Sequence, residues 1–264
     1  MPATFYLVEQ IVVRGKAFQL IFLLILGILT YVAYSLGKHG KVFVIRPLEG
    51  LDATWEGIGR AAEMGRPIMV LTGISGLGEP QTIAGLTVYG EVTQRAVSIG
   101  VETHTSNTDT NVIAFSEAIA KSAYDAAGKP EKYMLGEYVR WFGGDQFSYA
   151  MGCAGYILEK KPVMIVFMGY FLFDVIVSME SGNRVGSQII GGTLSALPEM
   201  SVFSDYLLIG EELYAASAQI SQDRMVIATL AGQDWMKLIL VALMIIGVVL
   251  ILAGNTAIVN LMGW

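Results

Sequence analysis

Residues 67–98 read PIMVLTGISGLGEPQTIAGLTVYGEVTQRAVS and contain the pattern that decides the fold. A compact apolar run at 67–72 leads into a glycine-rich turn. The turn is followed by residues 80–98, whose apolar side chains recur near the helical period. Pro80 suits the first turn of a helix, where its missing N–H would have no intrahelical partner. The stretch therefore predicts a strand, a tight turn and a helix, which together begin a βαβ unit.

The same alternation of short apolar runs and longer helical patterns continues along the chain. We expect further strands at residues 42–46, 101–105, 133–141, 163–171 and 201–207. We expect further helices at residues 52–64 with Asp52 as N-cap, at 109–127, 146–160 and 210–221, and from 224 onward. Strands that alternate with helices are typical of a parallel sheet covered on both faces. The predicted fold class is α/β, with a Rossmann-like, doubly wound, mostly parallel sheet.

Two uncharged segments enclose this region. Residues 17–36 (AFQLIFLLILGILTYVAYSL) and 238–253 (LILVALMIIGVVLILA) approach the length that crosses a hydrocarbon core of about 30 Å at about 1.5 Å per residue. The first segment is longer than the apolar part of a signal peptide, and no cleavage site follows it. We expect two transmembrane helices. The predicted domains are an N-terminal segment and first span at 1–37, the α/β domain at 38–234, and the second span and tail at 235–264.

A third apolar run, residues 163–179 (VMIVFMGYFLFDVIVSM), contains Asp174. A carboxylate at the centre of a bilayer costs a few kcal/mol. The first half of the run favours a fully buried strand of a parallel sheet. A third membrane segment is the alternative.

Composition excludes several classes of protein. The chain is 54% apolar and 15% charged, against about a quarter charged in average soluble proteins, so disorder is excluded. The net charge of −6 argues against a nucleic-acid partner, and the single cysteine, Cys153, excludes a disulfide scaffold. Basic residues beside the spans, among them Lys38, Lys41 and Arg46, favour a cytoplasmic α/β domain.

Glycine is abundant, with 30 residues in 264. The helical patterns predict that several of these lie inside helices, where each costs up to about 1 kcal/mol relative to alanine. They are Gly85, Gly90, Gly152, Gly155, Gly186, Gly191 and Gly192. We interpret them as sites of close packing, including packing between copies of the chain. The low charge of the domain itself also indicates surface that is buried against something else.

The glycine-rich turn is the first candidate ligand site, with Gly73, Ser75, Gly76 and Gly78 as binding residues. Backbone N–H groups in such a turn, followed by a helix N-terminus, suit an anion. The spacing matches neither the Walker A motif nor GxGxxG, and Glu79 places a carboxylate where a phosphate would lie. The alternative is a tight turn with a purely structural role.

Residues 102–110 (ETHTSNTDT) are nine consecutive polar residues at a predicted strand end. Ligands of open α/β sheets bind at the carboxyl ends of the strands, so Glu102, His104, Ser106 and Asn107 are further candidate binding residues. In a Rossmann-type site Glu102 would contact a ribose hydroxyl. The alternative is a loop that caps the next helix. With two histidines in the chain and no GxSxG elbow, we expect neither a histidine metal cluster nor a catalytic triad.

Arg184, in residues 178–186 (SMESGNRVG), is the last candidate. It either pairs internally with Asp174 or Glu180, or binds an anionic ligand.

The combination of GISGLGEPQTIAGL, ETHTSNTDT and SMESGNRVGSQIIGGTLSALPE between two terminal spans resembles an uncharacterised archaeal and bacterial family of membrane-anchored proteins, a domain of unknown function. The resemblance extends over nearly the whole chain. It implies membrane anchoring and an α/β domain, and it brings no activity, cofactor or catalytic residue.

Our leading functional hypothesis is a non-catalytic, membrane-anchored protein that self-associates or serves as a subunit of a membrane assembly. Its expected partners are the lipid bilayer and either copies of itself or other membrane subunits. The first alternative is a sensor or enzyme that binds a nucleotide or another anionic ligand at the glycine-rich turn. The second is an oligomeric transporter or channel component. The sequence identifies no cofactor.

Overall fold

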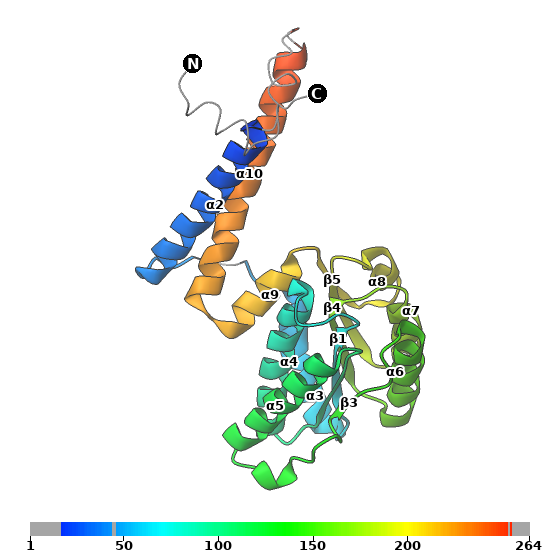
Figure 1. The fold of residues 1–264 in the computed structure, drawn as a ribbon. Coiled ribbons are helices and arrows are strands. Elements are labelled where there is room, and N and C mark those ends of the chain that lie inside the picture. The colour runs from blue at the N-terminus through cyan, green and yellow to red at the C-terminus, as the bar shows by residue number, and fades with distance from the viewer. Residues whose placement is uncertain (1–16, 44–45, 253, 255–264) are drawn as a thin grey trace. The chain divides into compact units, whose positions relative to one another are not determined.

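The computed structural model describes residues 17–43, 46–252 and 254. The chain divides into two compact units, Met1–Val44 with Asp223–Trp264 and Ile45–Gln222. The first unit contains the two long apolar helices, and the second contains the sheet and the helices that cover it (Figure 1).

A six-stranded parallel sheet forms the centre of the second unit, in the order β3-β2-β1-β4-β5-β6. This is the doubly wound order, in which the strand order reverses between β1 and β4 while all strands stay parallel. The predicted fold class is therefore confirmed. The strands are β1 (Ile68–Gly73), β2 (Thr103–Ser106), β3 (Val139–Arg140), β4 (Met164–Tyr170), β5 (Gln188–Thr193) and β6 (Tyr206–Ile209).

Helices cover both faces of the sheet (Figure 1). One face carries α3 (Glu49–Met64), α4 (Pro80–Ser98), α5 (Thr110–Ala126) and α9 (Glu212–Ser221). The other carries α6 (Gln146–Lys160), α7 (Asp174–Arg184) and α8 (Leu197–Phe203). A short 3-10 turn, Pro130–Lys132, precedes β3.

Alternate side chains of the central strands build the two halves of the core. In β1, Ile68 and Val70 belong to the cluster under α4, whereas Met69 and Leu71 belong to the cluster under α6. Every residue of β1 is buried, as the strand's apolar sequence predicts for a doubly covered sheet. The strand, turn and helix expected at residues 67–98 are thus present.

The third apolar run is a strand and not a membrane segment. Its first half forms β4, of which all but the last residue is buried, and its second half forms α7, which begins at Asp174. The buried-strand interpretation of residues 163–171 is therefore confirmed.

The helices α2 (Ala17–Lys38) and α10 (Arg224–Leu252) are long and apolar enough to cross a membrane. Only 11% and 6% of their apolar windows are buried, so neither is the core helix of a soluble domain. They pack against each other through small residues: a Cβ on Gly232 would lie 3.0 Å from the Cβ of Ala33. As predicted, α10 runs from residue 224 through the second apolar segment as one helix.

Several expected elements were wrong. Residues 42, 43 and 46 are not in a strand, and residues 44–45 lie outside the described part; Phe43 instead contacts the Trp235 ring edge-on at 6.1 Å. The expected strand at 133–141 shrinks to Val139–Arg140, at the edge of the sheet. The helix expected from Asp52 begins about one turn earlier, so Asp52 lies in its first turn and Leu48 is the N-cap.

The region after α7 differs most from expectation. Gly191 and Gly192, expected inside a helix, belong to β5, a strand that was not predicted because glycine is rare in strands. Gly186, also expected in a helix, lies in the turn before β5. Residues 201–203, expected in a strand, end α8, and the last strand starts at Tyr206. Gly191 is closely packed, because a Cβ there would lie 2.6 Å from Ser204 Oγ, and this hydroxyl would have to shift.

Candidate functional site

The junction between β1 and β4 is the place where a doubly wound sheet usually binds its ligand. Here the backbones that follow β1 and β4 remain hydrogen-bonded to each other beyond the last paired residues. Ile74 N–H donates to the Tyr170 carbonyl at 2.9 Å, beyond the paired residues Gly73 and Tyr170. Gly73 has φ +89°, and a Cβ there would overlap the carbonyl oxygen of Tyr170. The protein's own backbone therefore occupies the junction.

The loop between β2 and α5 lies beside the glycine-rich turn, as expected from their places at neighbouring strand ends. Asn107 Nδ2 donates to Thr72 Oγ1 at 3.1 Å, and Thr108 Oγ1 donates to the Ile74 carbonyl at 2.8 Å. A Cβ on Gly76 would lie 2.8 Å from Asp109 Oδ2. The loop and the glycine-rich turn therefore satisfy each other's hydrogen-bonding groups, which are the groups that a ligand at this edge would need.

Carboxylates of the chain occupy the helix N-termini at this edge. Glu79 caps α4 and accepts from Gln81 N–H, and Asp109 caps α5 and accepts from Asn111 N–H at 2.7 Å. Asp145 caps α6, where the hydrogen bonds from Ser148 lower the pKa of its carboxyl group. Helix N-termini attract anions, and each of these three N-termini already has a carboxylate of the chain as its cap. A phosphate would meet negative charge at each of them.

Gln81 ties the first turn of α4 to the end of β5. Its Oε1 accepts from Leu194 N–H at 2.7 Å and from Thr193 Oγ1 at 3.1 Å. Its Nε2 donates to Glu79 at 3.2 Å. The amide group thus joins the two halves of the sheet across the junction. The sequence analysis missed this residue, since a glutamine after a helix-starting proline carries no distinct signal.

Asp174 is fully buried at the start of α7, on the same edge of the sheet. Its Oδ1 accepts from Leu172 N–H at 2.8 Å and from Gln146 Nε2 at 2.9 Å, whereas its Oδ2 has no hydrogen-bond partner among the described residues. Burial raises the pKa of this carboxyl group above its ordinary value. Because burial disfavours the ionised form, Asp174 is a destabilising element wherever it is charged.

Of the predicted binding residues, Gly73, Ser75, Gly76, Gly78, Ser106 and Asn107 lie at this edge. Glu102 does not, because β2 starts after it, and it therefore lies at the opposite, amino edge. Arg184 ends α7, also toward the amino edge, where it pairs with Glu180 at 2.7 Å. The ion pair between Arg184 and Glu180, which was one of the two roles expected for Arg184, is therefore present.

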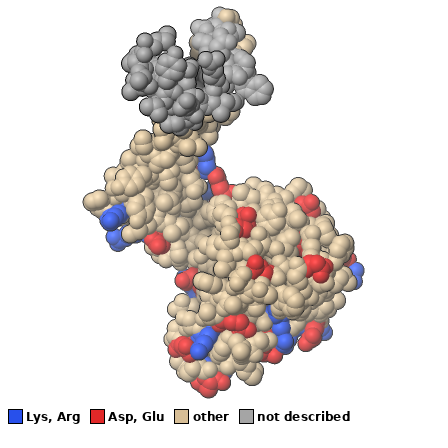
Figure 2. Space-filling model, in the orientation of Figure 1, with Lys and Arg blue, Asp and Glu red and all other residues tan. Residues whose placement is uncertain are grey.

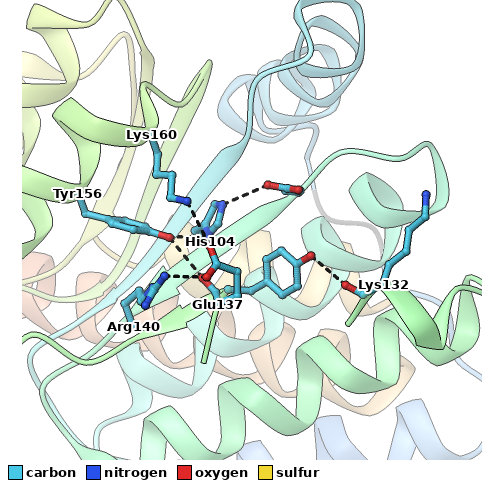
Figure 3. A network of polar contacts seen from close by, with 8 residues as sticks. His104, Lys132, Glu137, Arg140, Tyr156 and Lys160 are labelled. Atoms are coloured by element: carbon cyan, nitrogen blue, oxygen red, sulfur yellow. Dashed lines mark hydrogen bonds and ion pairs between the residues drawn. The ribbon is translucent and has the colours of Figure 1, made fainter. Parts of the chain in front are cut away.

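His104 lies within β2 and faces α6, away from the turn. It is buried, and its Nδ1 is 2.9 Å from Tyr156 Oη; its Nε2 is 3.7 Å from the carboxylate of Glu102 (Figure 3). This contact lowers the pKa of Glu102. Tyr138 lies against the imidazole on another side, with ring centroids 5.7 Å apart.

Glu137 organises the outer part of this network. Its carboxylate pairs with Arg140 at 2.9 Å and with Lys160 at 3.2 Å, which lowers the pKa of Glu137 (Figure 3). Both cations lie within 5.6 Å of the Tyr156 ring centroid. Charged side chains and a short strand are the usual protection of a sheet edge. The network therefore secures β3 against α6. Its signal in the sequence, two charges at a short strand and a third on a helix twenty residues later, is too diffuse to recognise.

The fold, its edge and the two long helices define an α/β protein with a doubly wound parallel sheet and two helices of membrane-spanning length. The family described as "Domain of unknown function (DUF6754)" matches residues 8–262. The chain belongs to this family, in agreement with the resemblance of its sequence. No curated protein and no solved structure matches the chain.

Proposed function

We propose that this protein is a membrane-anchored, non-catalytic subunit that self-associates or joins a larger membrane assembly, with α2 and α10 as the anchor. One observation carries the proposal: the ligand edge of the sheet is filled by the chain's own groups, while large apolar side chains stay uncovered on the helices around it. Contiguous exposed apolar surface of this kind marks interaction sites.

The charge distribution supports a protein partner rather than a polyanion. The net charge is −6, and the face of the α/β domain in Figure 2 is mostly uncharged, with scattered acidic and basic groups. Charge-poor surface is characteristic of the buried parts of interfaces. The basic residues Lys38 and Lys41, next to α2, support a cytoplasmic position for the domain.

The mass of the full-length protein in lipid nanodiscs tests the proposal, with alkaline extraction of membranes as the test of anchoring. We expect the chain to stay in the membrane fraction at high pH and to have a mass that is a multiple of 28.6 kDa, or to co-purify with another membrane subunit. A protein released by alkali, or one that is monomeric and unaccompanied, would contradict it.

A thermal-shift screen with nucleotides and phosphorylated metabolites tests the anionic-ligand alternative. Because Glu79, Asp109 and Asp145 already cap the helices, we expect no stabilisation. Saturable stabilisation that Ser75→Asp abolishes would favour the alternative.

A further inference from the structure

An exposed apolar surface of the α/β domain lies on α6 and at the start of α7. We call it the α6–α7 face, and it consists of Phe147, Met151, Gly155, Leu158, Phe173 and Ile176. Phe147 is 70% exposed and Met151 is 64% exposed. On α6 the spacing of these residues, four, four and three, places them on one side of the helix.

The α6–α7 face is continuous across the two helices. The rings of Phe147 and Phe173 contact each other at 5.1 Å, and α6 packs directly beside α7. The surface stays open to solvent on α7 as well, since Phe173 is 43% exposed and Ile176, about one turn further on, is 37% exposed. Within residues 46–222 no helix or strand covers this surface.

Gly155 lies between Met151 and Leu158, and no packing among the described residues requires a glycine there. A Cβ on Gly155 would meet nothing within 4 Å. In the same helix, a Cβ on Gly152 would overlap the ring of Phe142, so Gly152 is explained by internal packing. A glycine weakens a helix, and at an exposed site it lets another backbone approach closely. Gly155 therefore forms a notch in the apolar stripe.

Opposite charges lie at the two ends of α6. Asp145 caps its N-terminus with an exposed carboxylate, and Lys161 follows its C-terminus with an exposed ammonium group. A two-fold axis near the middle of α6 pairs this helix antiparallel with its own copy. That arrangement places Asp145 of each copy beside Lys161 of the other and sets the two helix dipoles in opposition.

We propose that the α6–α7 face binds a second copy of this chain, with the two α6 helices antiparallel and crossing between Met151 and Gly155. The inference rests on the proposed function and deepens it by naming the surface and the partner. The pairing of Asp145 with Lys161 uses charges of both signs and so favours a copy over an anionic lipid surface, whose phosphates would also meet the exposed carboxylates of Asp145, Glu159 and Glu180.

The mass of the full-length protein in nanodiscs, measured for the wild type and two variants, tests the surface. Met151→Asp places a charge in the α6–α7 face, and Phe115→Asp is the matched control on α5, where Phe115 is 58% exposed. We expect the wild type and Phe115→Asp to be oligomeric, and Met151→Asp to associate at least tenfold more weakly. If the wild type associates and Met151→Asp associates equally well, the surface is wrong although the proposed function stands. A wild type that is monomeric and without a partner contradicts both.

Cysteine cross-linking tests the crossing point. Burial raises the pKa of the Cys153 thiol to about 12, so the native cysteine gives little background with maleimides. Gly155→Cys has room for its side chain, and Gly59→Cys on α3 is the control at an equally open glycine. We expect a short bismaleimide to link Gly155→Cys into a covalent dimer and to leave Gly59→Cys unlinked. Equal linking of both variants, or no linking of Gly155→Cys in a protein that associates, overturns the proposal.

Discussion

At the scale of single residues, Gly73 closes the junction at which a doubly wound sheet would bind a ligand. Its φ of +89° is a backbone conformation that L side chains rarely adopt, and the carbonyl of Tyr170 occupies the place of its missing Cβ. Gly78 lies in the same turn and differs in both respects, since its Cβ would meet nothing within 4 Å. Two glycines of one motif thus have different roles.

Gly73→Ala should lower the free energy of unfolding by about 2 kcal/mol or more, because the Tyr170 backbone cannot move away without breaking the pairing of β1 with β4. Gly78→Ala should change it by no more than about 0.5 kcal/mol. Chemical unfolding in detergent checks both. Equal losses in the two variants would show that the turn is not closed as described.

Asp174 predicts a pH dependence of stability. Its pKa is raised by burial above the ordinary value of 3.8, so the folded state binds its proton more tightly than the unfolded state does. The stability from this group is complete below that value and is lost as the pH rises through the folded pKa. Relative to Asp174→Asn, the wild type should therefore lose stability as the pH increases from about 4.

Asp145→Asn is the control of opposite sign. The pKa of Asp145 is lowered by its hydrogen bonds with Ser148, so its contribution is present above its ordinary pKa and is lost on acidification. Unfolding temperatures measured between pH 3 and pH 7 compare the two variants with the wild type. Parallel curves for the wild type and Asp174→Asn would contradict the buried, ionisable state of Asp174.

Tyr156 holds the buried imidazole of His104. Tyr156→Phe removes the 2.9 Å contact with Nδ1, and the expected cost is about 1–3 kcal/mol, since a buried polar atom then lacks its partner. A double-mutant cycle with His104→Phe measures the coupling by chemical unfolding. A coupling energy of zero would show that the network does not depend on this pair.

At the scale of elements, helix α4 owes its position to one glycine. A Cβ on Gly85 would overlap the Met168 carbonyl of β4, whereas a Cβ on Gly90 would make an ordinary 3.4 Å contact with Ile119. Gly85→Ala should therefore destabilise the fold by about 2 kcal/mol or more, and Gly90→Ala should be neutral or stabilise it by up to about 1 kcal/mol. Thermal unfolding of the two variants distinguishes packing from helix propensity. A stable Gly85→Ala would contradict the close approach.

The predictability of each element follows from how local its cause is. The apolar run of β1 and the proline at the start of α4 are local signals, and both elements were correctly predicted. Strand β5 was missed because Gly191 and Gly192 carry no strand signal; their places depend on packing against β6 and α8, which is a tertiary effect. Glu102 was assigned to the wrong edge because the polar run 102–110 was interpreted as a loop at a strand end, whereas β2 itself occupies Thr103–Ser106 within that run and Glu102 precedes it.

The site shows the same limit. Asn107 and Gly73 were placed at one edge by the rule that strand ends gather there, and the structure has them there. Gln81 and the Glu137 network depend on side chains that meet across 112 and 23 residues of sequence, and nothing in the local pattern shows such contacts.

At the scale of the whole molecule, the sidedness of the α/β domain is open to direct measurement. The cysteine of Gly59→Cys is exposed, whereas the native Cys153 is buried, so labelling of this variant reports on position 59 alone. A maleimide that cannot cross membranes should label Gly59→Cys after lysis and not in intact cells, since the basic residues next to α2 favour a cytoplasmic domain. Labelling in intact cells would place the domain on the outside.

Association is the central claim, and the mass of the wild-type protein in lipid nanodiscs tests it most directly. The exposed α6–α7 face and the filled junction between β1 and β4 predict a particle with two or more copies of the 28.6 kDa chain, or one copy bound to another membrane subunit. A single, unaccompanied 28.6 kDa chain at every concentration measured would contradict the account.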